Sequence, residues 1–120
     1  MLPTRALFSA AKSTKMVEWL AVVYDKPNTD RSAVRAQHLA DIPANIESGK
    51  VTSAGAIFNE VPVEGAKPNF AGSMLTIVAD TKEEVIDILK KDIYAKEGIW
   101  NFDNVLVYPL GLAYRKGKDL

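Results

Sequence analysis

The sequence predicts an α+β fold of the ferredoxin-like βαββαβ type, in which a four-stranded antiparallel sheet carries two helices on one face. Segments rich in β-branched and aromatic residues alternate with helical patterns in the order strand, helix, strand, strand, helix, strand. The 120 residues are 48% hydrophobic and 25% charged, as is typical of one folded domain. The chain has no cysteine, so the fold depends on an apolar core without disulfides.

The first strand and the first helix have clear patterns. Residues 17–24 form a largely buried strand that ends at the turn-forming residues 25–29. Asp30 or Ser32 then caps a helix. Its buried stripe has helical spacing and consists of Val34, Leu39, Ile42 and Ile46. Its charged residues lie mostly on the other faces and are Arg31, Arg35, Asp41 and Glu47.

Proline and glycine mark the end of this helix and the next strand. Pro43 removes a backbone donor, so we expect either a kink there or an interruption near Asp41. Gly49 ends the helix as a left-handed cap. Residues 51–58 form the second strand, in which Gly55 indicates a bulge or a close approach by another group. Residues 59–69 form a long loop, a kind of segment that tends to carry function or mobility.

The second half of the domain has the strongest local signal. Residues 73–79 form the third strand, and the capping box from Thr81 to Glu84 starts the second helix. Residues 93–99 form a short irregular or helical link. Residues 104–114 form the last strand, where Pro109 indicates an edge position or a bulge.

The charge distribution separates the two ends from the folded part. The sequence has 15 basic and 15 acidic residues, but residues 1–15 contain three basic residues and no acidic one. Residues 1–15 are therefore a basic extension with the composition of a mitochondrial transit peptide, or a plain extension before an alternative start at Met16. The location expected is mitochondrial or cytoplasmic. Residues 16–115 form the domain, and residues 116–120 are a flexible tail.

The same features predict which partners the protein has. Residues 16–120 are mildly acidic, and the third strand lacks the basic and aromatic pattern of an RNA-binding sheet, so we expect no nucleic acid. No apolar run approaches the roughly 18 residues of a membrane span, so we expect no membrane. Helices on one face leave the other sheet face apolar and uncovered, which predicts a homodimer that packs sheet against sheet.

Among the kinds of catalysis, the composition leaves acid–base chemistry open. The absence of cysteine and the presence of one histidine exclude thiolate sites and any protein-only site with two imidazoles, and we expect no metal and no cofactor. His38 lies on the flank of the first helix's buried stripe, and Asp25 directly follows the first strand. A carboxylate beside an imidazole makes a general base near neutral pH. The alternative is a histidine and an aspartate with purely structural hydrogen bonds.

Further candidates surround this pair. Tyr94 and Trp100 either line a pocket for a small cyclic compound or anchor the link to the core. Ser73 either binds a ligand or only begins a strand. We expect the ligand pocket between the sheet and the first helix.

Five short motifs occur in a fixed order along residues 17–115. They are Asp25-Lys26-Pro27-Asn28, Arg35-Ala36-Gln37-His38-Leu39, Val51-Thr52-Ser53-Ala54-Gly55, Phe70-Ala71-Gly72-Ser73 and Lys91-Asp92-Ile93-Tyr94-Ala95-Lys96-Glu97-Gly98. Together they resemble the YciI-like (YCII-related) domain family. The resemblance implies a ferredoxin-like fold of the dimeric α/β-barrel superfamily, with His38 paired to Asp25 in the active site and Ser73 nearby. Gly55 and Tyr94 are the other substrate-binding residues expected.

The resemblance also bears on the reaction. One relative in the family is a dehydrochlorinase that acts on a chlorinated hydroxyquinol, whereas most members have no assigned reaction. The family usually has Asp-Pro-Tyr where this chain has Asp92-Ile93-Tyr94, and Ala-Gly-Pro where it has Ala54-Gly55-Ala56, so substrate preference does not carry over. The predicted function is proton abstraction with elimination or isomerisation of a small molecule. The alternative is a dimeric, stress-related or ligand-binding module without catalysis.

Overall fold

The structure is a computed structural model that describes residues 17–117. The predicted basic extension, residues 1–15, lies outside the described residues, as does the end of the predicted tail from residue 118 onward.

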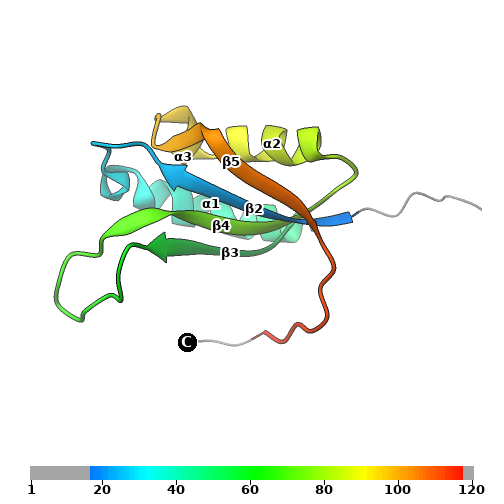
Figure 1. Ribbon diagram of the computed structural model, residues 1–120, viewed down its shortest axis with the longest axis horizontal. Helices are drawn as coiled ribbons and strands as arrows, with labels where there is room; N and C mark the ends of the chain where they lie inside the picture. Colours follow the sequence, from blue (N-terminus) through cyan, green and yellow to red (C-terminus); the bar gives the residue numbers. More distant parts are fainter. Residues whose placement is uncertain (1–16, 118–120) are drawn as a thin grey trace, which may run out of the picture.

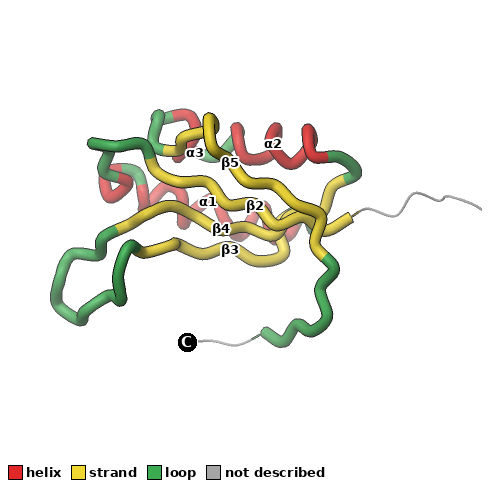
Figure 2. Tube along the Cα trace, viewed as in Figure 1, coloured by secondary structure: helices red, strands yellow, loops and turns green. Residues whose placement is uncertain are grey.

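One four-stranded sheet organises the domain. Its strands are β2 (Val17–Asp25), β3 (Val51–Phe58), β4 (Phe70–Ala79) and β5 (Trp100–Leu110). They are arranged in the order β3-β4-β2-β5, and every neighbouring pair is antiparallel. The helices are α1 (Arg35–Glu47), α2 (Lys82–Lys90) and the short α3 (Ile93–Lys96), preceded by a 3-10 turn, η1 (Arg31–Ala33). Figures 1 and 2 show the helices on one face of the sheet. The predicted ferredoxin-like α+β class is confirmed, with α3 as an addition in the link.

The core lies between the sheet and α2. Alternate residues of a strand point to the same face, so Ala21 and Val23 of β2 share the helix side with Leu75 of β4, which pairs with Ala21. These residues are buried together with Val85 and Leu89 of α2. The largest fully buried side chains, Tyr94 of α3 and Trp100 at the start of β5, close the core at that end.

Helix α1 covers its part of the sheet only loosely. None of its thirteen residues is fully buried, although three residues of the predicted stripe, Leu39, Ile42 and Ile46, lie within it. Two residues of the predicted stripe, Leu39 and Ile46, are 45% and 56% exposed. The predicted stripe therefore contributes little to the core, and space remains between α1 and the sheet.

The start of α1 differs from the prediction. Asp30 accepts a hydrogen bond from the Ser32 amide at 3.0 Å, but the element that it caps is η1. The α-helix itself begins at Arg35 without a side-chain cap. It continues through Pro43 to Glu47, so the predicted interruption near Asp41 is absent. Gly49 ends the element at φ 77°, as predicted.

The capping box of α2 is confirmed. The Thr81 hydroxyl accepts a hydrogen bond from the Glu84 amide at 3.2 Å. The Glu84 carboxylate reaches back and accepts from the Asp80 amide at 2.8 Å, one residue before the cap.

The last strand begins earlier than predicted. Strand β5 starts at Trp100 and ends at Leu110, whereas the apolar run pointed to residues 104–114. Its first residues pair with the end of β2, Trp100 with Asp25 and Asn101 with Tyr24, before a bulge shifts the register. Pro109 lies on an edge strand, as predicted, because β5 is the outermost strand on its side of the sheet.

Close packing against a neighbouring strand requires a residue without a side chain at Gly72 but not at Gly55. A Cβ atom on Gly72 would lie 2.4 Å from the carbonyl oxygen of Val23, so the two backbones meet without room for a side chain. A Cβ atom on Gly55 would meet no atom of the described chain within 4 Å, and the register of β3 does not shift there. Within residues 17–117, the structure therefore has neither the predicted bulge nor the predicted close approach at Gly55.

Within residues 17–117, no helix covers the other face of the sheet, which carries a group of apolar side chains. Cross-strand pairing places Leu20, Val22, Met74, Leu106 and Tyr108 on this open face. Leu106 is 38% exposed and Tyr108 is 56% exposed. At its edge, a hydrogen bond from the Thr52 hydroxyl and the guanidinium of Arg115 hold the pKa of Glu18 below its usual value. The ion pair joins Glu18 of β2 to Arg115 in the segment after β5.

Candidate functional site

The single histidine forms a pair with Asp92. The Nδ1 atom of His38, in the first turn of α1, lies 2.8 Å from the Oδ1 atom of Asp92, directly before α3. Both side chains are almost buried, 12% and 13% exposed. The same oxygen accepts the Tyr94 amide at 2.9 Å, so the cap of α3 also fixes this carboxylate in place.

This contact determines which nitrogen of His38 can act. A carboxylate only accepts hydrogen bonds, so Nδ1 carries the proton that faces Asp92. Nε2 then keeps its lone pair and is free to accept a proton. The ring also stacks on Tyr94, with centroids 4.0 Å apart and planes 14° apart, and Trp100 meets it edge-on. The imidazole is therefore held in one orientation by a charge and by two aromatic rings.

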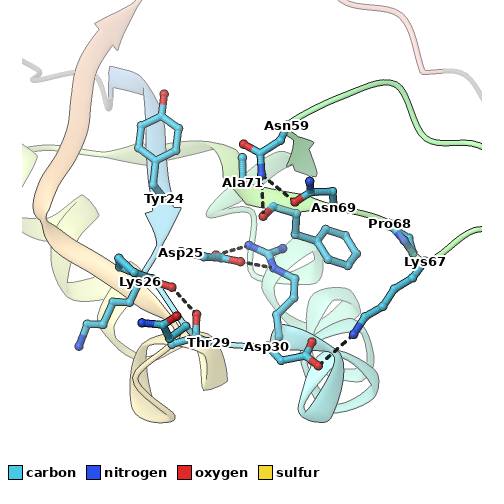
Figure 3. A pocket seen from close by; sticks show the side chains of 14 residues that line it. Tyr24, Asp25, Lys26, Thr29, Asp30, Asn59, Lys67, Pro68, Asn69 and Ala71 are labelled. Atoms are coloured by element: carbon cyan, nitrogen blue, oxygen red, sulfur yellow. Dashed lines mark hydrogen bonds and ion pairs between the residues drawn. The ribbon is translucent and has the colours of Figure 1, made fainter.

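The carboxylate predicted for His38 has a different partner. Asp25 accepts two hydrogen bonds from Arg31, from Nε at 2.9 Å and from Nη2 at 2.6 Å. Figure 3 shows Asp25 with these two bonds at the end of β2. The predicted pairing of Asp25 with His38 is therefore not formed, because Arg31 follows Asp25 closely in sequence and its planar guanidinium matches both carboxylate oxygens. Arg31 itself is 3% exposed, although it was expected on an outer face of the helix.

Ser73 belongs to the same network. Its Oγ atom lies 3.0 Å from Nη2 of Arg31 and 3.3 Å from the indole nitrogen of Trp100, and both of these groups donate to it. The side chain is 4% exposed. Strand β4 places it on the helix side of the sheet, beneath α1.

A small cavity of about 140 Å³ lies between α1 and the sheet, where the sequence predicted a pocket. Its polar lining consists of Arg31, Arg35, His38 and Ser73. Its apolar lining comes from α1, β3 and β4 and consists of Leu39, Ile42, Ala54, Gly55, Ala56, Met74 and Leu75. Met74 borders the cavity from a strand position whose side chain points to the open face. The cavity therefore combines an oriented imidazole with a mostly apolar wall, which is the usual make-up of a small-molecule site.

Three of the five predicted site residues line this cavity, namely His38, Ser73 and Gly55. Tyr94 stacks behind His38 and is fully buried, where burial raises the pKa of its hydroxyl. Asp25 instead lines a wider, more polar cavity of about 530 Å³ at the end of β2, which Figure 3 shows. Arg31 lines both cavities.

Sequence reasoning missed Asp92, Arg31 and Arg35. Asp92 had a signal, since an aspartate directly before a short helix is a common cap and it lies within one of the five motifs. Arg31 had none, because its burial depends on Ser73, which lies 42 positions later.

The described residues contain neither a cluster of metal-binding side chains nor a helix suited to crossing a membrane. Within residues 17–117, no group of three or more His, Cys, Asp or Glu side chains is placed to hold a metal ion. In the same range, no helix has both the length and the apolar character that crossing a membrane requires.

The comparisons with known proteins fit this fold. The model of the YCII-related domain family matches residues 17–109. Fusaric acid biosynthesis protein 2 of Gibberella fujikuroi is 27% identical over 99 residues, which cover 81% of this chain and 95% of that protein. Aspartate kinase FUB3 of Fusarium oxysporum f. sp. lycopersici is 26% identical over 108 residues, which cover 88% of this chain. The chain spans only 20% of the length of that kinase.

One solved structure has the same fold. It is 5-chloro-2-hydroxyhydroquinone dehydrochlorinase (TftG) from Burkholderia phenoliruptrix AC1100, in complex with 2,5-dihydroxybenzoquinone. The TM-score is 0.63 at 22% sequence identity, and the match covers 78% of this chain and 93% of that chain.

Proposed function

Because this chain belongs to the YCII-related domain family, we propose that it is a small-molecule enzyme that removes a proton and promotes elimination or isomerisation. The observation that carries the proposal is the contact of His38 Nδ1 with Asp92 Oδ1 at 2.8 Å, beside a cavity that His38 lines. The acid–base pair proposed is therefore His38 with Asp92, and Asp25 has a structural role with Arg31.

The chemistry follows from the oriented ring. Nε2 of His38 takes a proton from the substrate, and the positive charge that develops on the ring is stabilised by the Asp92 carboxylate. The electron pair left behind moves into the conjugated system of the substrate. In an elimination, the leaving group then departs with the electron pair of its own bond. His38 returns the proton to a different atom in an isomerisation, or to water in an elimination.

The size of the cavity limits the substrate. A cavity of about 140 Å³ is close to the engineered cavity of ~150 Å³ that holds one benzene molecule in another protein. The substrate proposed is therefore a single-ring compound or a molecule of similar size. The dehydrochlorinase of the same fold is named for a ring compound, and its complex holds another.

A homodimer is part of the proposal. The open face defined by Leu20, Val22, Met74, Leu106 and Tyr108 is apolar and continuous across three strands. Exposed apolar patches of this kind are typical of protein interfaces. A second copy of the chain, packed sheet against sheet, would cover it.

Chloride release from 5-chloro-2-hydroxyhydroquinone tests the proposed reaction with a defined probe. We expect the protein to accelerate this release, and we expect His38→Asn to slow it by about 10² or more, as for the loss of a general base. Asp41→Asn is the matched control, because Asp41 lies on the same helix and bonds only to the exposed Gln37 among the described residues.

The outcomes separate the proposal from its alternative. A rate that falls in His38→Asn but not in Asp41→Asn supports an enzyme with His38 as its base. Equal rates in the wild type and in His38→Asn would contradict it. Binding of the probe without any chloride release would favour the ligand-binding module.

A further inference from the structure

We infer that the cavity beneath α1 selects a small organic anion, whose charged oxygen is bound by the Ser73 hydroxyl and the Arg35 guanidinium. This inference rests on the proposed function, since it names the substrate class for the cavity that His38 lines. The shared chemistry is a negative oxygen on a flat, mostly apolar body, as in a carboxylate or a phenolate.

The hydrogen bonds of Ser73 leave one direction open. A serine hydroxyl has one donor hydrogen and two acceptor lone pairs. Arg31 Nη2 at 3.0 Å and Trp100 Nε1 at 3.3 Å are both donors, so they occupy both acceptor positions. The hydroxyl hydrogen of Ser73 must then be donated elsewhere. Ser73 is 96% buried and lines the cavity, so an acceptor oxygen on a ligand would satisfy it.

The charges around the cavity favour an anion. No acidic side chain is among the residues that line it in the described part of the chain. Arg31 is balanced by Asp25, with which it forms a bidentate pair. Arg35 lines the same cavity and forms no salt bridge within residues 17–117. Its guanidinium carbon lies 5.6 Å from the centre of the Phe70 ring, which leaves its donors available.

Burial increases the value of the Ser73 donor, whereas Arg35 supplies its charge from an exposed position. Seven of the cavity's eleven lining residues are apolar or glycine, so a bound oxygen would have few water molecules around it. Charge-assisted hydrogen bonds are about twice as strong as neutral ones. An ionised oxygen is therefore preferred over a neutral one of the same shape, while an ion without an apolar body gains nothing from the wall.

Calorimetric titration of the full-length chain with benzoate, benzamide and inorganic phosphate tests this inference. Benzoate and benzamide have nearly the same shape and differ in charge. We expect benzoate to bind about tenfold or more tightly than benzamide, and we expect phosphate to bind more weakly than benzoate. Arg35→Gln should remove the preference for benzoate over benzamide. Lys82→Gln, which removes one charge from the start of α2, is the matched control and should keep it.

The variants separate this inference from the proposed function. His38→Asn should keep the preference for benzoate while it loses chloride release, so each proposal can fail without the other. Ser73→Ala should weaken benzoate binding, and if it does not fold, Arg35→Gln still decides, because Arg35 is exposed. Equal binding of benzoate and benzamide, absence of benzoate binding at millimolar concentration, or a preference that survives Arg35→Gln would overturn the inference. Phosphate binding as tight as benzoate binding would overturn the role of the apolar wall and the inference with it.

Discussion

The Nδ1 atom of His38 lies 2.8 Å from the Oδ1 atom of Asp92, although the two residues are 54 positions apart. The contact joins the first turn of α1 to the cap of α3, so it orients the imidazole and also holds two helices together. Its chemical consequence is a defined tautomer, with the proton on Nδ1 and the lone pair on Nε2.

The tautomer of His38 is the most direct prediction. We expect nitrogen NMR shifts of the wild-type ring to show the proton on Nδ1, and Asp92→Asn to remove this preference, because a neutral amide can also donate to the ring. Asp25→Asn should leave the ring unchanged, since Asp25 bonds to Arg31. If Asp25→Asn alters the ring and Asp92→Asn does not, the assignment of the pair is wrong.

The buried ion pair of Asp25 and Arg31 should matter for stability. Their side chains are 11% and 3% exposed, so Arg31→Met leaves a carboxylate nearly buried without its partner. We expect the free energy of unfolding to fall by about 3 kcal/mol. Chemical denaturation measures this change.

The double variant Arg31→Met with Asp25→Asn is the control for this pair. It removes the unpaired charge, so it should lose less stability than the sum of the two single variants. Strict additivity would show that the two side chains do not interact.

Two glycines give a matched pair of substitutions. Gly72→Ala places a Cβ atom 2.4 Å from the Val23 carbonyl oxygen, so strands β2 and β4 must move apart. We expect a loss of about 2 kcal/mol in thermal or chemical unfolding. Gly55→Ala meets open space and should change stability by less than about 0.5 kcal/mol. Similar effects at both positions would contradict the difference in their surroundings.

The open face should hold two copies together. We expect a dimer mass in light scattering at micromolar concentration, and a monomer mass for Tyr108→Asp, because a charge there would be buried without a partner. Val61→Asp is the control, since Val61 is 84% exposed in the loop between β3 and β4. A monomeric wild type would exclude this interface.

The basic extension is tested by localisation. We propose that residues 1–15 direct the chain to mitochondria, so a fluorescent fusion of the whole chain should enter mitochondria. A fusion that begins at Met16 should remain in the cytosol. Identical cytosolic signals from both fusions would reject a transit peptide.

Most of the fold could be predicted because its signals are local. Thr81 and Glu84 mark the start of α2 within four residues. The alternation of apolar residues likewise indicates a strand without information from the rest of the chain. The start of β5 could not be predicted in this way. Asn101 is a poor strand former, and it lies in the sheet because it pairs with Tyr24 at the end of β2.

In the site, too, residues with a local signal could be predicted, and contacts that depend on the tertiary structure could not. His38 could be found because it is the single histidine and lies beside an apolar stripe. Its partner could not, because two aspartates were available and only the tertiary structure decides between them. Arg31 forms the ion pair with Asp25, and the cap of α3 places Asp92 against the ring of His38.

The loose packing of α1 has a consequence for how this protein family can evolve. The helix supplies one wall of the cavity, yet none of its residues is fully buried in the core. Substitutions at Arg35, Leu39 or Ile42 would reshape the cavity without opening a void in the core. New ligand preferences can therefore arise on α1 at little cost in stability, while β4 and α3 keep Ser73 and Asp92 in place.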